Sequence, residues 1–169
     1  MSNELLNSLK VPSPSEVEKE RTWIEEQIIE IGDDKLKELV EKAVEARVKA
    51  YKPYSDYPVG AAVLCNSGKI YSAPNTEVVT FTQTGHAEHN SINKAISEGE
   101  AESSRKFIKA LAVSHSGGSE SCGACRQEIT EHCDNALVIS VDQEGKPITV
   151  TSLKILLPYA FSPSNLLEK

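Results

Sequence analysis

The sequence lacks any long apolar run and any sign of a sorting signal. Nowhere in its 169 residues do about 18 consecutive apolar residues occur, the length that a membrane-spanning helix needs. The first twenty residues hold no basic region followed by an apolar stretch, which is the pattern of a secretory signal. We therefore expect a cytoplasmic protein with no membrane partner.

The sequence also lacks an excess of positive charge. It contains 18 Lys and Arg residues against 25 Asp and Glu residues, which gives a formal net charge of -7. Proteins that bind nucleic acids usually carry basic surfaces that displace counterions from phosphates. The charge therefore predicts no nucleic-acid partner and favours a small or neutral substrate, and the length suits one domain with an appendage.

Cysteine is scarce, with four residues in the whole chain. Four cysteines allow two disulfides, but a chain without a secretory signal is expected in a reducing compartment. There, the pair Cys122 and Cys125, which are separated by two residues, indicates metal binding or redox chemistry rather than a crosslink.

Apolar periodicity predicts an alternation of helices and strands. Two amphipathic helices are expected first, and we expect the earlier one to pack on its own domain after a loose tail at residues 1–13. The predicted helices are 15–31, 34–50, 87–98 and 123–132, and the predicted strands are 59–65, 69–73, 110–114, 136–141 and 147–151. This order predicts an α/β protein layered around a mixed sheet.

Candidate metal ligands lie at the starts of two predicted helices. His86 begins one helix, and Cys122 and Cys125 begin another, where the positive end of the helix favours the thiolate that binds metal. Three protein ligands leave the fourth tetrahedral position of zinc open, which is typical of a catalytic site. Glu88, two residues after His86, is expected beside the ion as the group that transfers protons.

Two other interpretations fit these residues. A structural zinc site needs a fourth ligand, for which the candidates are His89, His115, His132 and Cys133. A Cys-x-x-Cys pair also occurs in thioredoxin-like redox proteins. The combination of His-x-Glu with Cys-x-x-Cys favours instead the zinc-dependent nucleobase deaminases, in which a proline normally stands at the position of Ser121.

Several separated segments resemble the cytidine deaminase family, specifically its single-domain, homotetrameric kind. In the family's order, they are Lys52–Ala62, Asn75–Glu77, Gly85–Glu88, Cys122–Gln127 and Leu156–Phe161. The resemblance implies a three-layer α/β/α sandwich around a mixed five-stranded sheet. The implied deaminase domain spans residues 34–169, and the tail and helix of residues 1–33 lie outside the match.

The resemblance also implies an activity and a set of substrate contacts. The activity is zinc-dependent deamination of cytidine and deoxycytidine, with one zinc per subunit. Asn75 and Glu77 match residues that bind the sugar hydroxyls, and Ala87 matches an alanine whose backbone contacts the pyrimidine edge. Further implied contacts are Tyr57, Val59, Phe81, Phe161 and Ser121, of which the two phenylalanines match aromatics that reach a neighbouring subunit's site.

The chain departs from the family pattern at three places. Ser121 keeps the carbonyl of the usual proline but not its fixed φ. Single-domain relatives usually bind zinc with three cysteines and place an arginine after the glutamate, whereas here His86 is a neutral ligand and His89 replaces the arginine. The neutral ligand His86 and the loss of the arginine compensate for each other, because two thiolates already neutralise Zn²⁺ and leave less negative charge for an arginine to balance. The run 78–85 keeps the family's length but differs in composition, so substrate preference can differ.

The expected mechanism has Glu88 pass the proton of a water to N3 of cytosine, after which ammonia leaves. One alternative is a deaminase of a related cytosine compound, either a nucleotide, a nucleic acid or an antibiotic such as blasticidin S. For a nucleotide substrate, the string His86–Asn90 resembles deoxycytidylate deaminases. For a nucleic-acid substrate, the acidic charge of the chain gives a polynucleotide little attraction. Another alternative is a zinc-binding or assembly protein without catalysis.

Overall fold

Five apolar segments pair into one mixed sheet in the computed structural model of the chain, which describes residues 13–117, 120–162 and 164–167. The strands are β1 (Gly60–Cys65), β2 (Ile70–Pro74), β3 (Ile108–Ser114), β4 (Leu137–Val141) and β5 (Pro147–Ser152). Their order is β2-β1-β3-β4-β5, with β3 and β4 parallel and the other pairs antiparallel. The predicted fold class, an α/β/α sandwich around a mixed five-stranded sheet, is confirmed.

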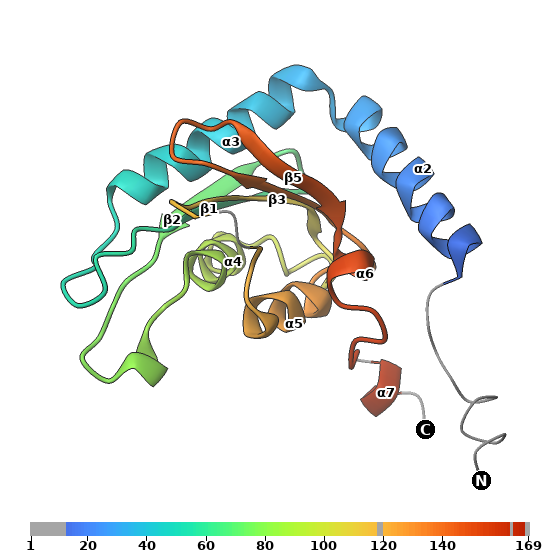
Figure 1. Ribbon diagram of the computed structural model, residues 1–169. Helices are drawn as coiled ribbons and strands as arrows, with labels where there is room; N and C mark the ends of the chain where they lie inside the picture. Colours follow the sequence, from blue (N-terminus) through green and yellow to red (C-terminus); the bar gives the residue numbers. More distant parts are fainter. Residues whose placement is uncertain (1–12, 118–119, 163, 168–169) are drawn as a thin grey trace, which may run out of the picture.

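Helices cover both faces of the sheet, as Figure 1 shows. On one face lie α2 (Pro14–Ile31) and α3 (Asp33–Val48), and on the other lie α4 (Ala87–Ser97) and α5 (Gly123–Glu131). Short elements follow as η1 (Phe81–Gln83), α6 (Leu153–Leu156) and α7 (Ser164–Leu167). The bounds of the four predicted helices and five predicted strands differ from the observed bounds by at most two residues, whereas η1, α6 and α7 were not predicted. Most of the predicted tail, 1–13, lies outside the described residues.

The alternation of side chains along β1 explains the two layers of core. Ala61 and Val63 face the core under α4 and α5, whereas Ala62 and Leu64 face the core under α2 and α3. All four are buried because both faces of the sheet are covered, so the strand is a continuous apolar run.

Helix α3 lies unusually close to the sheet at Gly60. A Cβ built on Gly60 would come within 2.1 Å of the Ala43 carbonyl oxygen and 2.2 Å of the Arg47 amide nitrogen. No side chain fits there, so glycine at the start of β1 is what allows the backbones of α3 and β1 to meet.

The first helix packs on its own domain, as expected. Ser13 caps it by accepting from the Glu16 amide, and Pro14 occupies its first turn, so the helix begins one residue earlier than predicted. Its apolar residues Ile24 and Ile28 pack against the core on the α3 side of the sheet. Lys109 Nζ, from β3, lies 2.7 Å from Glu30 Oε1 of this helix.

Glu20 fixes the middle of α2 to the far end of the sheet. Its Oε2 atom accepts from Ser152 Oγ at 2.7 Å and from Asn135 Nδ2 at 3.1 Å. We expect Glu20→Ala to lower the free energy of unfolding by roughly 1.5–3 kcal/mol, since hydrogen bonds to a charged group are of this strength. Urea denaturation would measure this free energy, with Glu26→Ala, at an exposed position of the same helix, as the control. Equal losses for the two substitutions would contradict the role of Glu20.

Candidate metal centre and substrate pocket

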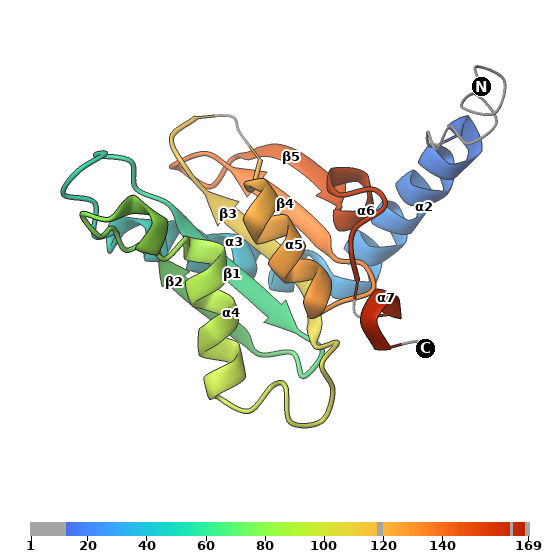
Figure 2. The same cartoon turned by 90° about the horizontal axis from the view of Figure 1, so that it is seen from below.

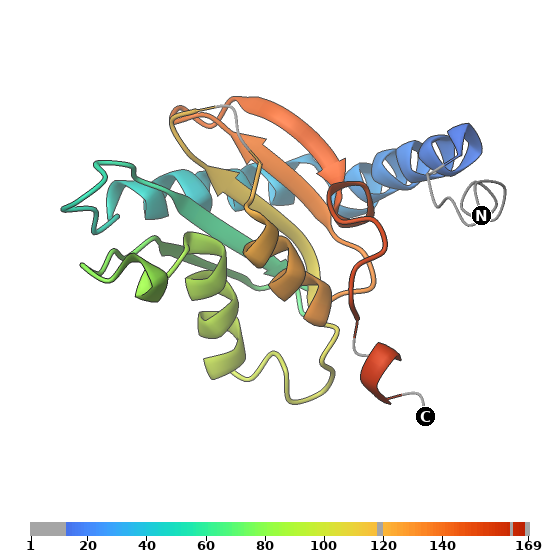
Figure 3. The ribbon, with the colours of Figure 1, turned by 60° about the horizontal axis from the view of Figure 1, so that its bottom comes forward.

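The three predicted ligands lie together where α4 and α5 begin. His86 is the residue that caps the N-terminus of α4, Cys122 caps α5, and Cys125 lies in the first turn of α5. Figures 2 and 3 show the two helices side by side on one face of the sheet. The sequence therefore folds so that two loop-to-helix junctions meet at one point.

The distances within this cluster match those of a zinc site. The two sulfur atoms lie 3.6 Å apart, and His86 Nδ1 lies 3.4 Å from Cys122 Sγ and 3.3 Å from Cys125 Sγ. Zinc bonds of about 2.3 Å to sulfur and about 2.0–2.1 Å to nitrogen, at tetrahedral angles, put neighbouring ligand atoms roughly 3.6–3.8 Å apart. One zinc ion per chain therefore fits between these three atoms.

The electrostatics of the cluster also call for a cation. Burial raises the pKa of the Cys125 thiol, and the neighbouring Glu88 carboxylate and Cys122 sulfur raise it further. A thiolate at this position is stable only beside positive charge, and two sulfurs with one imidazole are a donor set that zinc favours. The same interaction places Glu88, which is 4% exposed, next to Cys125.

The candidates for a fourth ligand are all engaged elsewhere. His89 bonds to Glu128, His115 to Ser140, His132 to the Arg105 carbonyl and Cys133 to the Ile129 carbonyl. Among the described residues, the ligand cluster has three members. The alternative of a closed structural zinc site therefore finds no support in this geometry.

Both ring nitrogens of His89 have partners other than the sulfur atoms. Its Nδ1 atom lies 2.7 Å from Glu128 Oε1, and its Nε2 atom lies 2.8 Å from Asn93 Nδ2. It joins α4 to α5 through these two contacts, so it does not take over the charge-balancing part that the resemblance gives to an arginine at this position.

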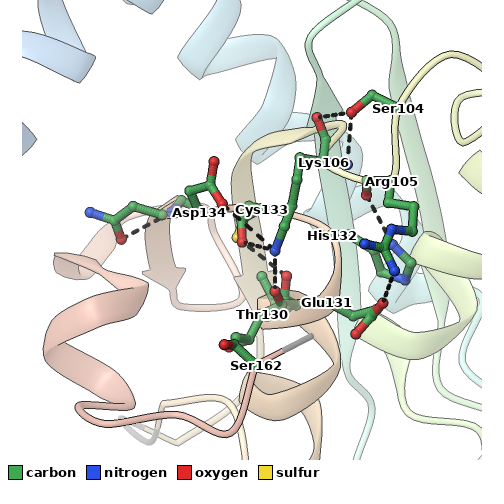
Figure 4. Close-up of polar contacts among 12 residues, drawn as sticks. Ser104, Arg105, Lys106, Thr130, Glu131, His132, Cys133, Asp134 and Ser162 are labelled. Atoms are coloured by element: carbon green, nitrogen blue, oxygen red, sulfur yellow. Dashed lines mark hydrogen bonds and ion pairs between the residues drawn. The ribbon is translucent and has the colours of Figure 1, made fainter. Parts of the chain in front are cut away.

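The far end of α5 is held by Lys106, as Figure 4 shows. Lys106 Nζ donates to the carbonyl oxygens of Thr130 at 2.9 Å and Cys133 at 2.8 Å. A cation at this end of a helix satisfies carbonyls that have no partner within the helix and interacts favourably with the helix dipole. Lys106 thus fixes the axis of α5, whose other end carries two of the three ligands.

A cavity of about 370 Å³ opens beside the cluster. This volume lies within the usual range for pockets that bind small molecules. Its lining includes the predicted residues Tyr57, Val59, Asn75, Glu77, Phe81, His86, Ala87, Glu88, Ser121 and Cys122. It also includes residues that the sequence did not single out for the pocket: Ser55, Thr84, Val113, His115 and Glu120.

Asn75 and Glu77 hold the wall of this cavity. Asn75 accepts from the Val59 amide at 2.9 Å and donates to the Tyr57 carbonyl at 3.1 Å. Glu77 accepts from the backbone amide of Tyr54 at 2.9 Å and from both the amide and the hydroxyl of Ser55. The two residues therefore tie the segment before β1 to the segment after β2.

These contacts also set the charge of Glu77. The Ser55 hydroxyl holds the pKa of the Glu77 carboxyl below its usual range, and the amides of Tyr54 and Ser55 lower it further, against the opposing effect of burial. The group therefore carries a full negative charge near neutral pH and keeps its acceptor capacity.

This lowered pKa predicts a pH-dependent stabilisation. A carboxyl whose folded-state pKa is depressed stabilises the fold above its unfolded pKa, about 4.3, and loses this contribution as the pH falls through the folded value. We expect Glu77→Gln to lower the melting temperature at pH 7, with a difference from wild type that shrinks below about pH 4. The exposed control Glu41→Gln should differ from wild type in melting temperature by the same amount at every pH. A difference for Glu77→Gln that is also constant with pH would contradict this stabilisation.

Asn90 shapes the backbone that precedes the histidine ligand. Its Nδ2 atom lies 2.9 Å from the Pro74 carbonyl, 3.1 Å from Thr76 Oγ1 and 3.3 Å from the Gly85 carbonyl. A Cβ on Gly85 would lie 2.6 Å from Asn90 Oδ1, so glycine is required for this approach. The amide nitrogen of Asn90 is thus engaged by the backbone and by Thr76, and it holds the chain in place on both sides of the histidine ligand.

His115 is a buried histidine that anchors the loop before Cys122. Its Nδ1 atom accepts from the Gly117 amide at 3.3 Å, so its Nε2–H donates to Ser140 Oγ at 2.8 Å. The sequence suggested it only as a spare ligand. Its position directly after an apolar strand was the signal that could have placed it at the same sheet edge as the pocket.

The two predicted aromatics lie differently. Phe81 lines the cavity of its own chain, is 59% exposed and packs edge-on against Tyr54 with ring centroids 5.9 Å apart. Phe161 is 58% exposed and does not line this cavity, and its carbonyl accepts from Gln127 Nε2 at 2.6 Å. Its expected contact with a neighbouring subunit's site stays a prediction.

None of the helices within the described residues combines the length and the apolar character needed to cross a membrane.

Comparisons with known proteins agree with this geometry. The model of the family described as "Cytidine and deoxycytidylate deaminase zinc-binding region" matches residues 33–141. A cytidine deaminase of Sporosarcina psychrophila is 39% identical over 133 residues, which are 78% of this chain and 94% of that protein. One of Halalkalibacterium halodurans is 33% identical over 130 residues, or 76% of this chain and 95% of that protein.

Solved structures give the same result. The crystal structure of cytidine deaminase from Burkholderia pseudomallei superposes with a TM-score of 0.67 at 36% identity, covering 73% of this chain and 96% of that one. The crystal structure of cytidine deaminase from Mycobacterium tuberculosis superposes with a TM-score of 0.63 at 33% identity, covering 75% of this chain and 96% of that one.

Proposed function

The chain belongs to the cytidine and deoxycytidylate deaminase family, and we propose that it hydrolyses cytidine and deoxycytidine to uridine and deoxyuridine with release of ammonia. The single observation that carries this proposal is the buried carboxylate of Glu88 beside a three-donor zinc cluster in a cavity of nucleoside size. Such an enzyme would serve pyrimidine salvage in the cytoplasm.

Zinc, when bound by His86, Cys122 and Cys125, supplies a Lewis acid that lowers the pKa of water toward about 7. Glu88 takes a proton from the attacking water and delivers it to N3 of the cytosine ring. As the bond from the water oxygen to C4 forms, N3 is protonated; Glu88 then takes the remaining proton of that oxygen and gives it to the exocyclic nitrogen, whose bond to C4 breaks so that it leaves as ammonia and C4 becomes a carbonyl. The backbone of Ala87, between ligand and carboxylate, contacts the pyrimidine edge.

The sugar is proposed to bind at Asn75 and Glu77. An ionised carboxylate has about four acceptor positions, and the described contacts of Glu77 use three of them. One position is therefore left for a ribose hydroxyl. Tyr57 and Val59, in the segment that these residues hold, line the side of the cavity proposed for the base.

The active form is proposed to be a homotetramer whose sites are completed by a neighbouring subunit. Phe161 and the rim residue Phe81 are both more than half exposed, which suits large apolar side chains that a second copy covers. The catalytic domain is proposed to span residues 34–169, with α2 as an accessory helix packed on it.

A substrate panel tests the proposed reaction. The loss of absorbance that accompanies deamination would be followed with cytidine, deoxycytidine, deoxycytidine monophosphate and blasticidin S. We expect turnover of both nucleosides and a much lower kcat/KM for the monophosphate, because the chain carries a net charge of -7, which disfavours a negatively charged substrate. A preference for the monophosphate or for blasticidin S would overturn the assignment.

A further inference from the structure

The side-chain amide of Asn90 connects two parts of the cavity wall. Asn90 belongs to α4, two residues after Glu88, and its Nδ2 atom lies 2.9 Å from the Pro74 carbonyl oxygen and 3.3 Å from the Gly85 carbonyl oxygen. Pro74 is the last residue of β2, and Gly85 directly precedes the ligand His86. Figure 2 shows α4 beside β2. One amide therefore joins the end of β2 to the backbone that presents the histidine ligand.

A short β-bridge reinforces this connection. Thr76 and Gly85 exchange two backbone hydrogen bonds, of 2.9 Å from the Thr76 amide and 3.0 Å from the Gly85 amide. Asn90 Nδ2 lies 3.1 Å from Thr76 Oγ1 at the same bridge. Thr76 stands between Asn75 and Glu77, so the segment that the bridge holds is the one proposed to bind the sugar.

The chain between the two parts of the wall gives little other support. Residues 78–84 lead from the proposed sugar contacts to Gly85, and their one regular element is the short η1. Val79 and Phe81 in this run are 71% and 59% exposed. Because the covalent link is a largely exposed loop, the contacts of Asn90 and the bridge are what fix the spacing between the sugar contacts and the metal ligand.

This spacing matters because a nucleoside must reach both parts of the wall at once. The proposed substrate presents its hydroxyls to Asn75 and Glu77 and its base to Glu88. A ligand held at both ends gains the full strength of both sets of contacts only when their separation matches its own length. For a reacting group, a displacement of about 1 Å can cost about 100-fold in rate.

We propose that Asn90 is a positioning residue that sets this spacing, so that the sugar hydroxyls contribute to binding while the base lies at the metal centre. Asn90 itself does not line the cavity, so it acts through the segments that it holds. The inference rests on the proposed function and deepens it, because it assigns part of the recognition of the sugar to a residue that does not touch the substrate.

Binding of two ligands that differ only in their hydroxyls tests this role. In zinc-loaded protein carrying Glu88→Gln, isothermal titration calorimetry would give Kd for cytidine and for 2′,3′-dideoxycytidine, which lacks both hydroxyls. Hydrogen bonds to a charged group such as Glu77 should make the ratio of Kd for dideoxycytidine to Kd for cytidine about tenfold or more. Adding Asn90→Ala should lower this ratio at least about threefold, because the hydroxyls then no longer meet their partners when the base is bound. A defect that weakens the whole site would affect both ligands equally and leave the ratio unchanged.

Two further variants complete the test. Thr76→Val removes the hydroxyl that Asn90 contacts and keeps the shape of the side chain, so the ratio should fall in the same direction but less. Asn93→Ala removes the same amide group from an exposed position of the same helix, where it contacts His89, and should leave the ratio unchanged. Thermal melting verifies that each variant is folded, and if Asn90→Ala does not fold, the result for Thr76→Val decides.

The possible outcomes separate the claims. A ratio that Asn90→Ala and Thr76→Val leave at the value of the parent protein, or that Asn93→Ala lowers equally, overturns the positioning role and leaves the proposed function intact. A ratio close to one in the parent protein shows that the hydroxyls are not recognised, which overturns the positioning role together with the proposed sugar contacts. If the folded, zinc-loaded parent protein binds neither ligand, the proposed function fails, and the positioning role fails with it.

Discussion

Glu88→Gln is expected to lower kcat for cytidine by roughly 10²–10⁴-fold, the range that a positioned general acid–base group contributes. The amide has nearly the shape of the carboxylate but does not take up the proton of water at neutral pH. Glu88 is 4% exposed and lies in the first turn of α4, so the isosteric change should leave the packing intact. Metal analysis should still find one zinc per chain.

The retained zinc is what makes this substitution informative. Glu98→Gln, at the exposed far end of the same helix, makes an equal charge change and should leave kcat unchanged. Undiminished deamination by Glu88→Gln would show that another group moves the proton. No deamination by the wild-type, zinc-loaded protein would favour the interpretation of a zinc-binding protein without catalysis.

Cys125→Ala is expected to abolish both zinc binding and turnover. Loss of an outer hydrogen-bond partner already costs about 10–100-fold in metal affinity, so loss of a direct ligand should cost more than about 100-fold. Cys125 is 2% exposed, and its sulfur lies within 3.6 Å of the other two ligand atoms. Zinc content after dialysis, measured by atomic absorption, gives the result directly.

Cys133→Ala is the matched control for Cys125→Ala. Cys133 is 3% exposed and lies just past the other end of α5, where its sulfur donates to the Ile129 carbonyl. This change removes the same atoms from a buried position but should spare zinc. An ion present at 1,000 times its Kd stabilises the fold by about 4.1 kcal/mol, so added zinc should raise the melting temperature of Cys133→Ala but not of Cys125→Ala. Equal zinc contents in both variants would contradict the ligand assignment.

The layers of the fold and the metal ligands were predictable from local signals. The apolar run of β1 and the helical spacing of Leu39 and Ala43 are properties of short segments, and each segment forms the element expected of it. The ligands were recognisable because His86 and Cys122 each stand at a helix start, where backbone geometry already determines how the side chain is presented.

The rest of the pocket depends on contacts between distant segments. Glu120 gave no local signal of lining a cavity, and the one signal for His115 was its position directly after an apolar strand, because the surroundings of both come from other strands and helices. The same is true of Glu20, whose partners Asn135 and Ser152 lie 115 and 132 residues away in the chain. Such proximity follows from the topology of the sheet, which a single sequence specifies only indirectly.

The structure also shows the surroundings of two residues at which the chain departs from the family pattern. Ser121 was expected to matter through its carbonyl and a looser loop, and the structure adds a buried hydroxyl that has no partner among the described residues. His89 was expected to stand where a neutral histidine ligand makes an arginine unnecessary, and the structure adds that it contacts Glu128 and Asn93. In both cases the residue type was known from the sequence, but the contacts of its side chain were not.

The most direct test of the central claim is the rate of uridine formation as zinc is added back to metal-free protein. The account predicts that equimolar uridine and ammonia appear, and that the rate rises in proportion to bound zinc and levels off at one zinc per chain. Uridine formation that is equally fast without zinc, or no uridine from protein holding a full equivalent of zinc, would contradict it.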